Sequence, residues 1–160
     1  MSRRTKKLFS LLVWYVPVLL VQLISAQVTI GSIDPWYANL VKSAWNPPPW
    51  VFGPAWTILY IMMTVAVWII YHENKSKRQG SIAYSLFFCQ LVINGLWSFL
   101  FFGAHMVGAA LINLGLLIFL VGLTAIHFFR VNSLAGWLLL PYFMWITYAF
   151  SLNAAIYWLN

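Results

Sequence analysis

The sequence predicts an all-α membrane protein, a bundle of five transmembrane helices. Of its 160 residues, 63% are hydrophobic and only 7% are charged, whereas a soluble domain carries roughly 25% charged residues. A helix needs about 20 apolar residues to cross the bilayer core. Five stretches without Asp, Glu, Lys or Arg meet this need, at about residues 8–26, 51–72, 82–102, 106–129 and 134–159. We therefore expect one transmembrane domain over residues 1–160.

The first apolar stretch follows a basic start, as a secretory signal peptide would. It contains Trp14, Pro17 and Gln22, and the segment after it, Gln27-Val28-Thr29, is a poor cleavage site because signal peptidase prefers small residues there. We expect the stretch to be retained as the first span.

Basic residues predict the orientation of the bundle. With five spans, eight of the nine basic residues fall on one side of the membrane: Arg3, Arg4, Lys6, Lys7, Lys75, Lys77, Arg78 and Arg130. Only Lys42 falls on the other side. Because cytoplasmic loops are enriched in Lys and Arg, the N-terminus should be inside and the C-terminus outside. The net charge of +7 is thereby explained without a nucleic-acid partner.

The connection between the first two spans is the only long one. It runs from Gln27 to Pro49, carries several aromatic residues and ends in three consecutive prolines, which cannot continue a helix interior. Loops of this length are commonly functional or disordered. The aromatic residues and prolines favour an ordered lid over the outer helix ends, with a short helix near residues 36–43.

Aromatic and amide side chains form stripes on three spans. At helical spacing, the stripes are Trp56, Tyr60 and Met63 on the second span; Gln90, Asn94, Trp97, Ser98 and Phe101 on the third; and Tyr142, Trp145, Ala149 and Asn153 on the fifth. Together they could line a pocket for a flat, largely apolar molecule in the outer half of the bilayer. The alternative is structural, because membrane helices use Asn and Gln for interhelical hydrogen bonds, and Trp and Tyr gather at membrane interfaces.

The fourth span carries Gly108, Gly115 and Gly122 on one face, seven residues apart. Small residues let membrane helices approach closely. The stripe predicts either close packing within the bundle or the seam of a homodimer, and the sequence does not choose between them.

Several classes of site are disfavoured. His72, His105 and His127 lie near different helix ends without metal-ligand spacing, so no metal is expected. The usual groups of acid–base catalysis are missing from the spans, as are the intramembrane charges of an ion-coupled transporter. The single cysteine, Cys89, is interpreted as a small buried apolar residue.

The order and spacing of these motifs resemble the translocator protein family, also called the tryptophan-rich sensory protein, peripheral-type benzodiazepine receptor or TspO/MBR family. The resemblance covers nearly the whole chain. It is carried by Trp36-Tyr37, Trp45-Asn46-Pro47-Pro48, Trp50-Val51-Phe52-Gly53-Pro54, Trp56-Thr57, Leu59-Tyr60, Gln90, Asn94, Trp97-Ser98, Phe101-Phe102-Gly103, Pro141-Tyr142, Trp145, Ala149 and Leu152-Asn153.

The resemblance implies a five-helix bundle, commonly dimeric, that binds tetrapyrroles such as protoporphyrin and aromatic drug-like ligands beneath the first loop. It places the binding site at Trp45, Asn46, Trp56, Tyr60, Gln90, Asn94, Trp97, Trp145 and Ala149. Sterol binding by relatives depends on a basic residue after a tyrosine late in the fifth span. Here Tyr157 is followed by Trp158, Leu159 and Asn160, which argues against a sterol and for a bacterial-type member.

Three hypotheses follow. The first is a receptor or carrier for a hydrophobic tetrapyrrole in a bacterial cell membrane, with no obligatory cofactor. The second is an enzyme that degrades porphyrin in light, in which Trp56 and Trp145 would act. The third is a structural or regulatory membrane subunit without a small ligand.

Overall fold

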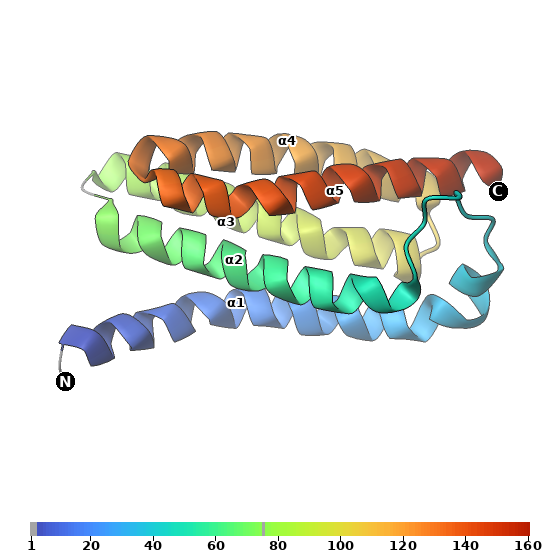
Figure 1. Ribbon diagram of the computed structural model, residues 1–160, viewed down its shortest axis with the longest axis horizontal. Helices are drawn as coiled ribbons and strands as arrows, with labels where there is room; N and C mark the ends of the chain where they lie inside the picture. Colours follow the sequence, from blue (N-terminus) through green and yellow to red (C-terminus); the bar gives the residue numbers. More distant parts are fainter. Residues whose placement is uncertain (1–2, 75) are drawn as a thin grey trace.

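Five long helices make up the bundle in the computed structural model, which describes residues 3–74 and 76–160 (Figure 1). They are α1 (Arg3–Ser32), α2 (Phe52–Glu73), α3 (Lys77–Ser98), α4 (Val107–Val131) and α5 (Ser133–Leu159). Each is long and apolar enough to cross a membrane, and the described residues form no strand. The predicted all-α bundle of five spans is confirmed. The two ends of the chain lie at opposite ends of the bundle (Figure 1), as an odd number of spans requires.

Three helix boundaries differ from those expected. α1 continues to Ser32 instead of ending near residue 26, because the sequence has no proline between residue 26 and Pro35 to stop it. The short helical segment of the first loop therefore comes earlier than expected, at Ile33–Tyr37. α3 begins at Lys77, five residues before the apolar stretch, since Ser76 accepts a capping hydrogen bond from the backbone N–H of Gln79 (3.5 Å).

The connections at the helix ends are tight. A π-helical segment, Phe99–Gly103, ends α3 before the turn into α4. Only Asn132 separates α4 from α5, and its side chain does two things. Its Oδ1 accepts from the N–H of Ala135 (3.1 Å), which caps α5, and its Nδ2 donates to the carboxylate of Glu73 at the end of α2.

The core lies between α2, α3, α4 and α5, whereas α1 lies at the periphery (Figure 1). Among the α1 side chains that the structure describes, only Val18 is buried. Met63, Phe87, Leu117 and Ile146 are fully enclosed, one from each of the other four helices. α1 thus contacts the bundle along one side, against α2 and α3, and presents most of its apolar surface outward.

The glycine stripe of α4 packs inside the chain. A Cβ atom added to Gly108, Gly115 or Gly122 would lie 2.9, 3.8 or 3.5 Å from an aromatic ring of α5. Those rings repeat at the same interval of seven residues: Tyr157, Phe150 and Phe143. Packing within the bundle therefore accounts for the stripe, and a homodimer seam stays a prediction.

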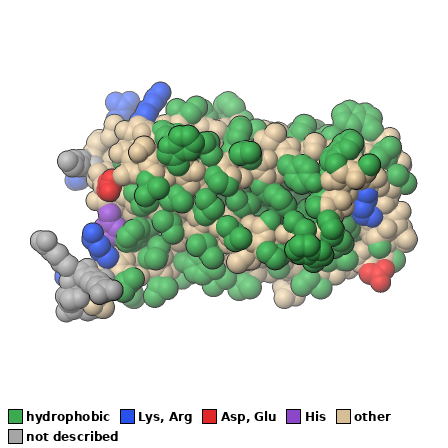
Figure 2. Space-filling model, in the orientation of Figure 1, with side chains coloured by type: hydrophobic (Ala, Val, Ile, Leu, Met, Phe, Trp, Pro, Cys, Tyr) green, Lys and Arg blue, Asp and Glu red, His purple; other side chains and the backbone are tan. Residues whose placement is uncertain are grey.

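The surface of the bundle is an apolar belt with charges at its two ends (Figure 2). The end that holds the start of α1 also holds Arg78, Arg130 and Glu73; Lys75, assigned to the same side, lies outside the described residues. The opposite end has Lys42 and Asp34 in the first loop region. Cys89 is exposed on this belt, so its interpretation as a buried residue is wrong.

Candidate functional site

Four polar side chains from three helices form a hydrogen-bonded group in the middle of the bundle, here called the amide network: Tyr60, Gln90, Asn94 and Tyr142. The hydroxyl of Tyr60 on α2 donates to Oδ1 of Asn94 on α3 (2.6 Å). Asn94 Nδ2 donates to the hydroxyl of Tyr142 on α5 (2.9 Å), which itself donates to Gln90 Oε1 (3.0 Å). Gln90 Nε2 contacts the sulfur of Met63 (3.1 Å).

The amide network satisfies its own polar atoms. All four side chains are at most 4% exposed, and both polar atoms of Asn94 have partners within the group. This arrangement agrees with the structural alternative, in which amides join helices by hydrogen bonds. A ligand that used Gln90 or Asn94 would first have to displace a phenol.

Aromatic rings occupy the space between the amide network and the first loop. This aromatic layer comprises Phe52, Trp56, Trp145 and Tyr148. Trp145 contacts Phe52 and Tyr148, with ring centroids 6.0 and 5.8 Å apart. Trp56 stacks on Tyr60 at 5.5 Å, so it joins the aromatic layer to the amide network.

One donor in the aromatic layer is left over. The indole Nε1 of Trp145 is buried and has no hydrogen-bond partner among the described residues. A buried donor without a partner costs about 1–3 kcal/mol of desolvation, and such groups are rare enough in native proteins to call for an explanation. The aromatic layer therefore contains one N–H whose acceptor is not found among the described residues.

The first loop closes over the aromatic layer, as a lid would. The hydroxyl of Tyr148 donates to the backbone carbonyl of Trp45 (2.6 Å). Further along, Val41 exchanges two hydrogen bonds with the side chain of Asn160, at 2.9 and 3.1 Å. Asn46 accepts from the hydroxyl of Tyr37 at 3.4 Å. The side of the loop around Trp45 and Asn46 is thus held against α5.

Trp97 and Ala149, both assigned to the pocket, belong to the same apolar cluster as Trp56 and Trp145 but are not part of the ring contacts that define the aromatic layer. Trp97 stacks on Phe101 at 5.3 Å and donates from Nε1 to Asn153 Oδ1 (3.1 Å). It thereby joins the small apolar cluster under Trp36. Ala149 is buried on α5, where it leaves room beside the larger rings without offering a polar group.

The three histidines each have a structural partner. His72 Nε2 lies 3.0 Å from the hydroxyl of Ser10, His105 stacks on Trp36 at 4.0 Å, and His127 contacts a backbone carbonyl of α3. In the part of the chain that the structure describes, no three His, Cys, Asp or Glu side chains gather as a metal site would.

Sequence reasoning missed two residues of the site. Phe52 and Tyr148 were not singled out, although Tyr148 follows Trp145 at a spacing of three, which places both on one face of α5. Tyr142 lies on a predicted stripe, but the sequence does not reveal that its hydroxyl joins the two amides of α3.

The fold and this site together define an integral multi-pass membrane protein with a layer of aromatic side chains under its first loop. Residues 13–159 match the sequence model of the TspO/MBR family. The chain is 42% identical over 132 residues to the tryptophan-rich protein TspO of Archaeoglobus fulgidus, covering 82% of this chain and 84% of that protein. It is 34% identical over 135 residues to the translocator protein of Sus scrofa, covering 84% and 80%. The tryptophan-rich sensory protein of Cereibacter sphaeroides is 37% identical over 131 residues, covering 80% of each chain. The chain belongs to the TspO/MBR family, which confirms the resemblance seen in the sequence.

Proposed function

We propose that this protein is a membrane receptor or carrier for hydrophobic tetrapyrroles of the protoporphyrin type and for aromatic drug-like molecules, in a bacterial cell membrane. The observation that carries the proposal is the unpartnered indole N–H of Trp145, buried among aromatic rings under the first loop. The names of two relatives, a translocator protein and a tryptophan-rich sensory protein, agree with a carrier or sensor.

The chemistry of the aromatic layer fits a flat macrocycle. Rings of Trp56 and Trp145 would stack on it, and aromatic pairs contribute about 0.5–1.5 kcal/mol each beyond the burial of area. Trp145 Nε1 would donate to a propionate or to another acceptor on the ring edge. Lys42, a natural partner for a propionate, already donates to the carbonyls of Ala38 and Leu40 (3.1 and 3.0 Å), which leaves Trp145 as the donor without a competing partner.

The remaining predicted residues can contact a ligand only after the protein rearranges. Trp45 and Asn46 belong to the lid, which must lift for a large ligand to enter from that side. Asn94 Oδ1 can accept from a ligand in place of Tyr60 only when the bond between Tyr60 and Asn94 opens, and Gln90 Oε1 only when its bond from Tyr142 opens. Shallow binding should therefore depend on Trp56 and Trp145, and deeper binding on the amide network as well.

The test compares two conservative tryptophan variants on the same helix. Trp145→Phe keeps an aromatic ring but removes the N–H, whereas Trp137→Phe changes a tryptophan that is 62% exposed elsewhere on α5. Protoporphyrin is titrated into each protein in lipid nanodiscs, in the dark, and binding is read from the shift of the porphyrin absorption band. We expect saturable binding, weakened roughly 10-fold or more in Trp145→Phe because a hydrogen bond to a charged group is lost, and unchanged in Trp137→Phe.

Two results would contradict the proposal. Linear uptake without saturation in the wild type would mean that the porphyrin only partitions into lipid, which favours the structural or regulatory subunit. Equal affinities in the wild type and in Trp145→Phe would remove Trp145 from the site.

A second candidate function uses the same rings. Trp56 lies in ring contact with both Tyr60 and Tyr142, at 5.5 and 6.2 Å, so an indole beside a photo-excited porphyrin would have oxidisable phenols next to it. In this reading the protein degrades porphyrin in light, with dioxygen as the oxidant. Illumination of the same samples should then give one defined product, which Trp145→Phe loses and Trp137→Phe keeps. The same bleaching by free tryptophan in nanodiscs would sink the enzyme hypothesis.

A further inference from the structure

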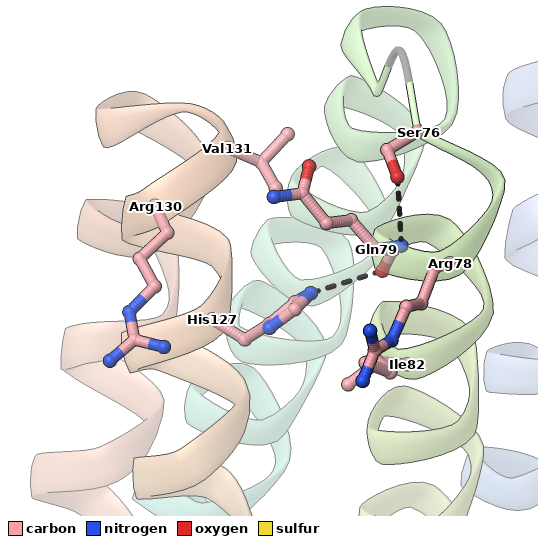
Figure 3. A pocket seen from close by; sticks show the side chains of 7 residues that line it. All are labelled: Ser76, Arg78, Gln79, Ile82, His127, Arg130 and Val131. Carbon is pink, nitrogen blue, oxygen red and sulfur yellow. Dashed lines mark hydrogen bonds between the residues drawn. The ribbon is translucent and has the colours of Figure 1, made fainter.

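A basic groove lies at the end of the bundle away from the aromatic layer, between the start of α3 and the end of α4. It encloses about 560 Å³ and is lined by Arg78, Gln79, Ile82, His127, Arg130 and Val131, with Ser76 at its rim. Figure 3 shows Arg78 on one wall and Arg130 on the other, with the ring of His127 between them. No acidic side chain lines the groove.

His127 holds the two walls together. Its Nε2 lies 3.0 Å from the backbone carbonyl of Gln79, and because a carbonyl can only accept, this ring nitrogen carries the proton. The bond joins α4 to the first turn of α3 across the groove (Figure 3). The separation of the two walls is therefore set by the fold and does not depend on a ligand.

The two arginines of the groove are electrostatically unpaired. The whole chain has two acidic residues, Asp34 and Glu73. Asp34 lies in the loop region at the other end of the bundle, and the carboxylate of Glu73 accepts from Asn132. Among the described residues, neither Arg78 nor Arg130 forms an ion pair with a carboxylate. Two arginines that line one groove without a counter-charge are suited to an anion, and guanidinium matches the geometry of phosphate oxygens.

An apolar, lipid-facing strip continues from the groove along both helices. On α3, Ile82 follows Arg78 by four residues and is 42% exposed. On α4, Ile126 and Leu123 precede Arg130 by four and seven residues and are 53% and 38% exposed. These spacings keep each strip on the face of its arginine. The site thus combines a cationic end with an apolar track toward the bilayer core, which is the shape of a charged amphiphile.

We propose that this groove binds the phosphodiester headgroup of an anionic phospholipid, with an acyl chain along the seam between α3 and α4. Basic pockets between membrane helices on the cytoplasmic side are suited to acidic lipid headgroups. The shared chemistry is a phosphate between two arginines, and a soluble phosphate ion is the other source of it. The apolar strip favours the lipid, because a free ion would gain nothing from it. The proposal does not depend on tetrapyrrole binding, which concerns the opposite end of the bundle.

Cys89 provides a natural labelling site at which contact with a lipid acyl chain can be measured. Cys89 is the only cysteine, it is exposed, and it lies eleven residues after Arg78, or about three helical turns. It is therefore on the same face of α3, roughly 16 Å deeper along the helix axis. A bimane fluorophore attached to Cys89 in detergent reports contact with brominated acyl chains, because bromine quenches it on close approach.

The experiment compares labelled protein in phosphatidylcholine nanodiscs that contain equal amounts of either dibrominated phosphatidylglycerol or dibrominated phosphatidylcholine. The test variant is Arg78→Gln with Arg130→Gln. The matched control is Lys6→Gln with Lys7→Gln, which removes the same charge from exposed positions at the same end of the bundle. Inorganic phosphate is added to wild-type samples at constant ionic strength to separate the two sources of phosphate.

We expect the brominated anionic lipid to quench the wild type more strongly than the brominated neutral lipid. The enrichment should fall roughly five-fold for each arginine removed and persist in the lysine control and in the presence of phosphate. Equal quenching by both lipids in the wild type would overturn the proposal without any variant. An excess that survives loss of both arginines, or disappears equally in the lysine control, would also overturn it. Displacement by inorganic phosphate would identify a soluble-anion site instead.

Discussion

The hydroxyl of Tyr142 on α5 bonds two amide side chains of α3 at once. It accepts from Asn94 and donates to Gln90, in a residue that is fully buried. Ser or Thr on α5 would be too short to reach both amides, and Phe would reach them without a polar atom. Together with the bond from Trp97 to Asn153, this phenol fixes how α3 is rotated with respect to α5.

Tyr142→Phe should destabilise the protein by about 1–2 kcal/mol. The change leaves one donor of Asn94 and one acceptor of Gln90 without their partner, and single interhelical bonds in membrane proteins contribute about 0.6 kcal/mol on average, while an unsatisfied buried group costs more. The measurement is thermal unfolding in nanodiscs without ligand. Tyr157→Phe, at a position that is 52% exposed, serves as the matched control. Equal melting temperatures for the two variants would show that the amide network contributes no stability.

The residues of the site could be predicted only in part. Helical spacing alone places Tyr60, Gln90, Asn94 and Tyr142 on inward-facing stripes, because spacing depends on the backbone geometry of one helix at a time. Their hydrogen bonds to one another depend on how three helices are rotated and shifted, which no local pattern contains. The same limit applies to the hydrogen bond from Trp97 on α3 to Asn153 on α5.

At the scale of elements, the first loop is the part that must move if a large ligand enters from outside. It is attached to α5 at two places, through Tyr148 to Trp45 and through Asn160 to Val41. The long helices beneath it are tied by backbone hydrogen bonds and core packing instead. The loop is therefore the element whose opening should cost least.

Removal of both attachments should speed the opening of the loop. Tyr148→Phe with Asn160→Ala deletes the three hydrogen bonds between the loop and α5 and one bond from Asn160 to Ile156 at the end of α5. We expect hydrogen–deuterium exchange in peptides covering residues 38–50 to accelerate several-fold, with no change in α4. Thr147→Ala, which removes an exposed hydroxyl on the same helix that bonds only within its own turn, should exchange like the wild type. Unchanged exchange in the double variant would mean that the prolines and apolar contacts alone hold the loop.

The sequence predicted the five helices more reliably than it predicted the residues at which they begin and end. Each of the five apolar stretches forms a helix, because in a bilayer a single segment can satisfy its backbone hydrogen bonds only as a helix. The ends depend on local chemistry that hydropathy does not measure. Ser76 caps α3 early, and α1 runs to Ser32 before the chain reaches Pro35.

At the scale of the whole molecule, the distribution of charge predicts which way the bundle faces. The end that carries the start of α1, the α2–α3 connection and Arg130 should be cytoplasmic. Single-cysteine variants in a Cys89→Ser background test this. Asn39→Cys, in the exposed first-loop region, should react with a membrane-impermeant maleimide applied to intact bacterial cells. Lys77→Cys should react only after the membrane is opened, and the reverse pattern would show that the orientation is wrong.

The same charge distribution limits how two copies of the chain can meet. In the predicted topology, one side of the membrane carries eight basic residues and Glu73, and the other side carries only Lys42 and Asp34. Moving an elementary charge across the membrane against its potential costs about 2.3 kcal/mol per 100 mV, so an inverted copy would be strongly disfavoured in the same bilayer. We therefore expect every copy to insert in one orientation. Any pair that forms should then be parallel, with both first loops facing the same compartment.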